Sequence, residues 1–123
     1  MTPEPPLVLI VDDNGKNRKL AGDVLGAAGF RTLEAESGGA GLALAAERLP
    51  EVILMDLRLP DMDGADAARA LRSAAPTAHI PVVALSALPL TERDEWLLAS
   101  GFAGYIEKPI SVADFPEQVR RYC

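Results

Sequence analysis

The chain has 123 residues, of which 49% are hydrophobic and 24% charged, and this size suits one globular domain with a single core. Its net charge of -6 argues against a protein that binds the phosphate backbone of nucleic acids, which would need a clustered basic surface. The one cysteine, Cys123, excludes an internal disulfide and fits a reducing compartment, and no apolar run is long enough to span a bilayer. We therefore expect a soluble, cytoplasmic protein with no nucleic-acid or membrane partner.

Strand-like and helix-like patterns alternate along the chain. Residues 1–6 are rich in proline, which disfavours helix, so they predict an extended lead-in to a single domain over residues 7–123. The expected strands are Leu7–Val11, Arg31–Ala35, Val52–Met55, Pro81–Leu85 and Tyr105–Glu107.

Helical periodicity follows each predicted strand. The first helix, from about Lys16 to Ala28, places Leu20, Val24 and Ala28 on one face with Ala21 and Leu25 beside them, and Gly29 ends it. The second helix is expected to begin after the N-cap Ser37 and to end before Pro50, and its apolar residues are Leu42, Ala45, Ala46 and Leu49. The third is expected from about Gly64 to Ser73 and the fourth from about Leu90 to Ser100. The last is expected to begin at a capping box formed by Ser111–Asp114.

Strict alternation of five strands and five helices predicts an α/β fold. The connections are then right-handed crossovers, and the sheet is parallel and covered by helices on both faces. The first, third and fourth strands are almost continuously apolar, as buried parallel strands are.

Four of the predicted strands are followed by polar residues suited to phosphate or metal chemistry. These residues are Asp12 and Asp13, Asp56, Ser86 and Lys108. Because the carboxyl ends of parallel strands meet at one crevice, where ligands bind, we expect these side chains to lie together.

The three acids predict a site for a hard divalent cation. Asp12 and Asp13 alone would favour a solvated turn or a helix N-cap. With Asp56 beside them, the three carboxylates would repel one another and need a cation to remain ionised together. Mg²⁺, with Mn²⁺ as an alternative, suits such oxygen ligands.

Asp56 is the expected nucleophile, because a carboxylate can accept a phosphoryl group as aspartyl phosphate. Such a transfer needs positioning and charge neutralisation, which a cation and Lys108 would supply, although Lys108 could also be an ordinary surface lysine. The Lys108–Pro109 bond could be cis. Ser86 offers a hydroxyl to a phosphoryl oxygen or caps the following turn. Gly64 either permits a tight turn or close backbone approach, or reflects only simple loop geometry.

These positions, in this order on these strand ends, resemble the response-regulator receiver domain of two-component signalling. The resemblance runs from about Leu7 to Arg121, and stand-alone receivers of the DivK kind and receivers of hybrid histidine kinases are the most similar. It rests on Asp12-Asp13-Asn14, Leu54-Met55-Asp56-Leu57, His79-Ile80-Pro81-Val82-Val83-Ala84 and Lys108-Pro109-Ile110-Ser111-Val112. It implies a doubly wound (βα)5, flavodoxin-like fold with strand order 2-1-3-4-5.

The resemblance also implies roles at the metal and phosphate site. Asp56 would accept phosphate from a phosphohistidine of a partner protein. Asp13 would bind Mg²⁺ directly, and Asp12 directly or through water. The backbone carbonyl of Arg58 would complete the protein ligands, with Asp56 itself.

Ser86 and Lys108 would hold the phosphoryl oxygens. Tyr105 stands where the family has its switch aromatic, which turns inward when Ser86 moves to the phosphate. A half-buried strand aromatic with its hydroxyl in water is an equal alternative. Arg58 and Leu88, which flank the site, are expected to alter the lifetime of phospho-Asp56.

The implied partners are a histidine kinase or histidine phosphotransfer protein and a downstream protein. No output domain follows the last helix in this sequence, and the chain is expected as a monomer or a weak, phosphorylation-linked dimer. It would not be an enzyme, although it would take part catalytically in its own phosphorylation and dephosphorylation. Two alternatives are a receiver-like interaction module that acts without phosphorylation and the excised receiver of a hybrid histidine kinase.

Two enzyme classes are alternatives to this interpretation. A hydrolase with an aspartyl-phosphate intermediate would carry D-x-D after the first strand, whereas Asp12-Asp13 is followed by Asn14. A metal-dependent nucleic-acid enzyme is suggested by Asp61-Met62-Asp63, but the acidic balance of the chain disfavours it.

Three further features carry weaker signals. His79, the one histidine, precedes a strand in a loop and is expected at the surface. Trp96 is expected at the edge of the core, with an exposed partner contact as the alternative. The segment Lys16–Arg18 opens the first helix near the crevice and could meet a partner helix or only solvent.

Overall fold

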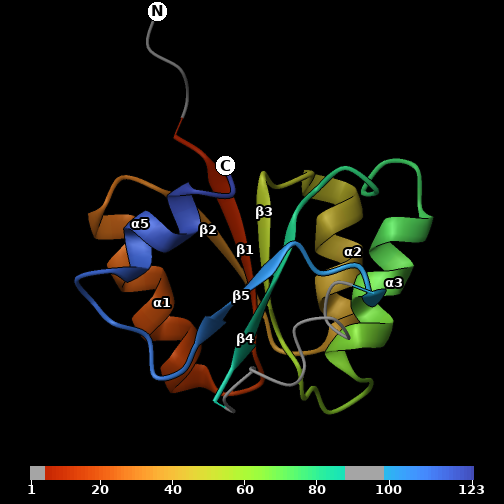
Figure 1. Ribbon diagram of the computed structural model, residues 1–123, viewed down its shortest axis with the longest axis horizontal. Coiled ribbons are helices and arrows are strands. Elements are labelled where there is room, and N and C mark those ends of the chain that lie inside the picture. The colour runs from red at the N-terminus through yellow and green to blue at the C-terminus, as the bar shows by residue number, and fades with distance from the viewer. Residues whose placement is uncertain (1–4, 88–98) are drawn as a thin grey trace, which may run out of the picture.

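The computed structural model describes residues 5–87 and 99–123, and in these ranges it forms one parallel sheet with helices on both faces (Figure 1). The strands are β1 (Leu7–Val11), β2 (Arg31–Ala35), β3 (Val52–Asp56), β4 (Val82–Ser86) and β5 (Gly104–Glu107). The helices are α1 (Gly15–Ala27), α2 (Gly38–Arg48), α3 (Gly64–Ser73) and α5 (Phe115–Arg120). All strand pairs are parallel, in the order β2-β1-β3-β4-β5, so the predicted fold class and strand order are confirmed.

Residues 88–98 include Leu88, Trp96 and most of the helix predicted from Leu90 to Ser100. These expectations lie outside the described residues, as do those for residues 1–4.

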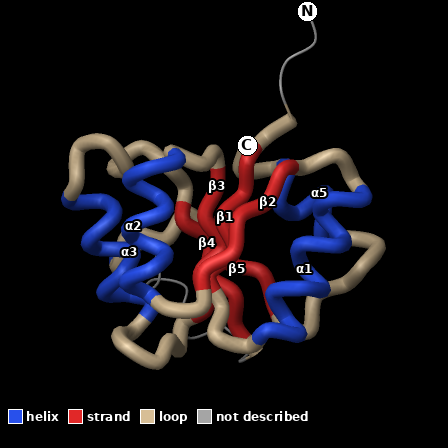
Figure 2. The backbone as a smooth tube through the Cα atoms, turned by 180° about the vertical axis from the view of Figure 1, so that it is seen from behind, coloured by secondary structure: helices blue, strands red, loops and turns tan. Residues whose placement is uncertain are grey.

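Alternation along the central strands builds the two halves of the core. In β1, Leu9 and Val11 face one cluster, whereas Val8 and Ile10 face the other, because successive strand side chains point to opposite faces. Helices α2 and α3 cover the first face and α1 and α5 the second, as Figures 1 and 2 show from opposite sides. Buried faces on both sides explain why the central strands are apolar throughout.

Side-chain caps set the starts of α1 and α2. The Oγ of Ser37 accepts a hydrogen bond from the backbone N–H of Ala40, which confirms the predicted cap of α2. The Oδ1 of Asn14 accepts from the N–H groups of Lys16 and Asn17 at the start of α1. This second cap was not predicted.

Two expectations for the first two helices are corrected. The buried face of α1 is centred on Ala21 and Leu25, and Leu20 is 42% exposed. Leu49 lies one residue beyond α2 in the left-handed region, with φ 47°, and is exposed. The residue before a proline is disfavoured in the α region, so Pro50 ends the helix earlier than the apolar pattern suggests.

The start of the last helix also differs from the prediction. Residues 111–114 form a turn, in which the carbonyl oxygen of Ser111 accepts from the N–H groups of Asp114 and Phe115. Asp114 makes no side-chain capping bond, and the α-helix begins at Phe115. The capping box expected at Ser111–Asp114 is therefore wrong.

The described residues include the end of the predicted lead-in and four of the predicted helices. Pro5 and Pro6 precede β1 without regular secondary structure. Among the described residues, no helix has the length and apolar character needed to cross a membrane. The division at residue 7 stays a prediction.

Candidate functional site

An acidic cluster lies at the carboxyl edge of the sheet. Strands β1 and β3 are neighbours in register, with Val11 opposite Met55, so the residues that follow them come together. One carboxylate oxygen from each of Asp12, Asp13 and Asp56 lies within 4.8 Å of the other two. The sequence-based prediction that the strand ends bring these acids together is confirmed.

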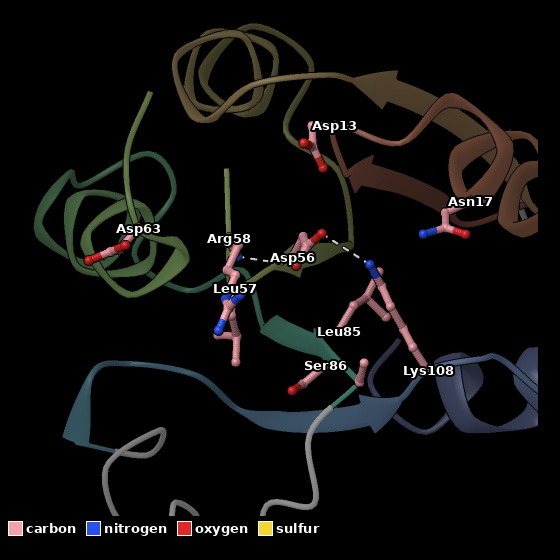
Figure 3. A pocket seen from close by; sticks show the side chains of 10 residues that line it. Asp13, Asn17, Asp56, Leu57, Arg58, Asp63, Leu85, Ser86 and Lys108 are labelled. Atoms are coloured by element: carbon pink, nitrogen blue, oxygen red, sulfur yellow. Dashed lines mark hydrogen bonds and ion pairs between the residues drawn. The ribbon is translucent and has the colours of Figure 1, made fainter. Parts of the chain in front are cut away.

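Lys108 reaches into this cluster from the end of β5. Its Nζ lies 2.7 Å from Oδ2 of Asp12, and its side chain is 17% exposed. The same Nζ lies 3.0 Å from Oδ2 of Asp56 (Figure 3). Its backbone N–H donates to the carbonyl oxygen of Ser86 at 2.7 Å, which ties it to β4, and the Lys108–Pro109 bond is cis. The alternative of an ordinary surface lysine is therefore excluded.

Burial and hydrogen bonds within the cluster shift the pKa values of two groups. Burial raises the pKa of the Asp56 carboxyl group, although hydrogen bonds from the Arg58 N–H and from Lys108 oppose this. Burial alone would lower the pKa of Lys108, but its hydrogen bonds to Asp12 and Asp56 outweigh burial and raise it. Lys108 is thus charged at neutral pH beside a carboxylate that burial makes costly to ionise.

A cavity of about 640 Å³ opens over the acids. Asp13, Asp56, Arg58, Ser86 and Lys108 line it, among others, so it exposes both carboxylates and hydrogen-bond donors (Figure 3). Ser86 is buried in the end of β4, beside β5, where the sequence predicted it. The cavity therefore gathers the groups that a phosphoryl transfer requires, namely a nucleophile, a cation and hydrogen-bond donors.

Gly64 holds the loop between β3 and α3 against Asp56. Its N–H donates to the carbonyl oxygen of Leu57 at 2.9 Å. A Cβ at this position would collide with the carbonyl oxygen of Asp56 and the Cα of Leu57. Of the two roles that the sequence allowed for Gly64, the structure favours close backbone approach.

Asp61, in the same loop, has a structural role that the sequence analysis missed. Its two carboxylate oxygens each accept a hydrogen bond, from the N–H groups of Gly38 and Gly39 at 2.8 Å, at the start of α2. These bonds lower the pKa of Asp61. The sequence indicates only that an acceptor is needed, because Ser37 can satisfy part of the first turn of α2, and it does not identify Asp61 as that acceptor.

Three residues with weaker sequence signals, Arg18, Tyr105 and His79, differ in their surroundings. Arg18 donates to the carbonyl oxygen of Asp12 and pairs with Glu34, so it is not a purely solvated residue. Tyr105 is 39% exposed and lines a separate cavity next to β5, and His79 is exposed, as predicted.

The acidic cluster fits a divalent cation. Its ligand atoms are carboxylate oxygens, which hard cations prefer, and three acids face one ammonium group. In the part of the chain that the structure describes, this is the one group of three acids arranged like metal ligands. Asp61 lies outside this group of acids. The described residues therefore offer no second metal cluster to support the nucleic-acid enzyme suggested by Asp61-Met62-Asp63.

Comparisons with known proteins agree with this geometry. A family model described as the response regulator receiver domain matches residues 8–120. The polar-differentiation response regulator DivK of Brucella anthropi is 38% identical over 118 residues, which are 96% of each chain. The chemotaxis response regulator CheY4 of Vibrio cholerae superposes with a TM-score of 0.91 at 26% identity, covering 97% of this chain and 99% of that chain.

A further solved structure bears on the metal. The receiver domain of the sensor histidine kinase PA1611 of Pseudomonas aeruginosa, described with a magnesium ion coordinated in its active-site cleft, has a TM-score of 0.86. It is 30% identical, and the match covers 96% of this chain and 97% of that one. This chain belongs to the response-regulator receiver domain family, the signalling modules of two-component systems.

Proposed function

We propose that the chain is a phosphorylation-switched receiver, which accepts a phosphoryl group on Asp56 from a phosphohistidine of a histidine kinase or phosphotransfer protein. The signal then passes to a downstream protein in the cytoplasm. One observation carries this proposal: the Asp56 carboxylate clusters with those of Asp12 and Asp13 and contacts the ammonium of Lys108, at the wall of a cavity of about 640 Å³.

The transfer would proceed by direct displacement at phosphorus. A carboxylate oxygen of Asp56 forms the new O–P bond while the P–N bond to the donor imidazole breaks and its electron pair remains on the imidazole nitrogen. Oδ1 accepts the Arg58 N–H at 3.1 Å and Oδ2 contacts Lys108, so the carboxylate is held on both sides. Holding the nucleophile in one orientation removes part of the entropic barrier.

The remaining groups would neutralise the incoming phosphate. A Mg²⁺ ion held by Asp12, Asp13, Asp56 and the carbonyl of Arg58 would supply the positive charge that draws phosphoryl oxygens to an acidic site. Lys108 and the hydroxyl of Ser86 would bind the phosphoryl oxygens. Hydrogen bonds to Asp12 and Asp56 raise the pKa of Lys108, so its ammonium is charged at neutral pH before the transfer.

Ser86 and Tyr105 would carry the switch. They lie on neighbouring strands, where Ser86 pairs with Glu107 and Ala84 with Tyr105. Movement of the Ser86 hydroxyl to the phosphate would open space for Tyr105, which is now 39% exposed, to turn inward. The added charge would thus bias a local two-state element and leave the sheet intact.

The test is the intact mass of the chain after incubation with Mg²⁺ and acetyl phosphate. We expect one phosphate adduct on the unaltered chain, none without Mg²⁺, and none on Asp56→Asn. Asp63→Asn is the matched control, because Asp63 lines the same cavity but makes no side-chain capping bond. An adduct that persists on Asp56→Asn would overturn the assignment of Asp56.

A receiver-like module that acts without phosphorylation predicts a different pattern. Neither acetyl phosphate nor beryllofluoride, which mimics a phosphoryl group on an aspartate, would bind to the cluster. A chain that binds beryllofluoride but retains no phosphate would instead have a short phosphate lifetime, and Arg58 at the cavity wall is expected to alter that lifetime.

A further inference from the structure

Arg18 reaches back from α1 over the turn that follows β1. Its Nη1 donates to the carbonyl oxygen of Asp12 at 2.8 Å, and its Nε lies 3.4 Å from Oε1 of Glu34 on β2. The side chain is only 18% exposed. The guanidinium group is therefore fixed at both ends, between the end of one strand and the neighbouring strand.

The bond from Arg18 completes the immobilisation of Asp12. The N–H of Asp12 donates to the carbonyl oxygen of Ala35, its Oδ1 accepts from the N–H of Asn14, and its Oδ2 contacts Lys108. With the carbonyl bound by Arg18, every backbone and carboxylate polar group of Asp12 has a partner. Asp12 is thus a rigid point in the acidic cluster.

Asp13 has no such support of its own. In the ranges that the structure describes, its exposed carboxylate makes no hydrogen bond or ion pair, although it belongs to the cluster. The backbone therefore sets the position of the Asp13 Cβ, and with it the space that the carboxylate can reach. The carbonyl of Asp12 and the N and Cα of Asp13 share one peptide plane, so a bond that fixes this carbonyl also orients Asp13.

We propose that Arg18 is a positioning residue for the divalent-cation site. It holds the Asp12–Asp13 peptide so that the unpaired carboxylate of Asp13 stays within reach of Asp12 and Asp56. This inference rests on the proposed function, because it assigns to Arg18 a role in binding the cation that phosphorylation of Asp56 would need.

Charge and positioning predict opposite effects of removing Arg18. A guanidinium group near a cation site repels the cation, so its loss would tighten binding if charge were its whole effect. Loss of a group that orients a metal ligand weakens binding, by about tenfold at the lower end of the usual range. The sign of the change in affinity therefore separates the two roles.

The experiment measures Mn²⁺ affinity from the electron paramagnetic resonance signal of the free ion. We expect Arg18→Met to weaken Mn²⁺ binding about tenfold. Arg18→Lys should weaken it less, about threefold, since it keeps the charge but replaces the planar fork with a single point donor. Lys19→Met is the matched control: it removes the same charge from the next residue of α1, whose side chain is 78% exposed, and it should leave the affinity unchanged.

A second measurement excludes a merely structural role. The apparent Mg²⁺ requirement for phosphorylation should rise in Arg18→Met, whereas the rate at saturating Mg²⁺ should stay within about twofold of that of the unaltered chain. Urea unfolding checks that the variants are folded. If Arg18→Met does not fold, the same two measurements are made on Arg18→Lys instead.

Three results would overturn the inference in distinguishable ways. Equal or tighter Mn²⁺ binding by the Arg18 variants would exclude positioning. Equal weakening by Lys19→Met would show that the loss of affinity does not depend on the contacts of Arg18 with Asp12 and Glu34. Failure of the unaltered chain to bind Mn²⁺, or unchanged binding by Asp13→Asn, would remove the proposed cation site itself and the inference with it.

Discussion

Two acids that share the end of β3 and the loop after it, Asp56 and Asp61, have opposite environments. Asp56 is partly buried beside Lys108, and burial raises its pKa. Asp61 is exposed and accepts hydrogen bonds from Gly38 and Gly39, which lower its pKa. The contrast shows that burial and hydrogen-bond partners, and not the type of the acid, decide in which direction its pKa moves.

The contrast extends to stability. The cluster around Asp56 brings three carboxylates to one ammonium group, so its net charge opposes folding unless a cation binds. The bonds of Asp61 instead satisfy backbone donors at a helix start and favour folding. The charges of the Asp56 cluster thus lower the stability of the fold when no cation is bound, whereas the hydrogen bonds of Asp61 in the neighbouring loop raise it.

The largest effect is expected from Gly64→Ala, which would displace the loop that carries both acids. The new Cβ would meet the backbone of Asp56 and Leu57, which cannot yield as a side chain does. We expect unfolding in urea to show a loss of about 1–3 kcal/mol. Gly26→Ala is the control: Gly26 lies within α1 with nothing within 4 Å of a new Cβ, so this change should stabilise the chain. Equal stability of the two variants would contradict the close approach.

A smaller loss is expected from Asp61→Asn. The amide keeps one oxygen for Gly38 or Gly39 but places an NH₂ group against the other backbone donor. We expect Tm to fall by roughly 3–5 °C in a thermal scan. Asp63→Asn should leave Tm unchanged, because Asp63 makes no capping bond at α3.

The two acids should also respond to pH with opposite signs. The folded pKa of Asp61 is lowered, so its contribution is present above the usual value of 3.8 and is lost as the pH falls below it. The folded pKa of Asp56 is raised, so its ionisation opposes folding above 3.8, and this penalty is relieved on acidification through the folded pKa.

Urea midpoints across this range test the signs. From pH 7 downward, the advantage of the unaltered chain over Asp61→Asn should shrink below pH 3.8, the usual carboxyl value. If Asp56→Asn is more stable than the unaltered chain at pH 7, this difference in stability should begin to shrink at a pH above 3.8. If the urea midpoints of the two variants, each relative to the unaltered chain, changed with pH in the same direction, the predicted opposite signs would be contradicted.

The smallest effect is expected from Asp13→Asn, measured without divalent cations. The substitution removes one of three neighbouring like charges and no hydrogen bond among the described residues. We expect a gain of about 0.5 kcal/mol in the free energy of unfolding. Adding Mg²⁺ should stabilise the unaltered chain and not the variant, and a loss of stability in the variant without cations would contradict the repulsion.

The sequence predicted the sheet and the main residues of the site for the same physical reason. The central strands are buried on both faces, so their apolar runs are continuous, and the residue after each run lies at the carboxyl edge. Asp12, Asp13, Asp56, Ser86 and Lys108 could all be placed in this way. Their predicted roles stay predictions until phosphate and metal binding are measured.

What the sequence could not predict depends on partners distant in the chain. The cap that Asp61 supplies to α2 joins residues 22 and 23 positions apart, and no periodic pattern indicates it. Arg18 was expected to meet a partner or solvent, because nothing in α1 reveals a bond back to the Asp12 carbonyl. Gly64 allowed two roles until the backbone of Asp56 was seen beside it.

The contact between Lys108 and Asp12 joins residues 96 positions apart, nearly the full length of the chain. Contacts of such separation form late, because the chain must first lose the entropy of closing the loop between them. A chain whose last strand has not docked therefore holds the three acids without their ammonium group. The cluster is thus completed only when β5 joins the sheet, so a chain clipped before Lys108 would keep the acids but lose the ammonium group that two of them contact.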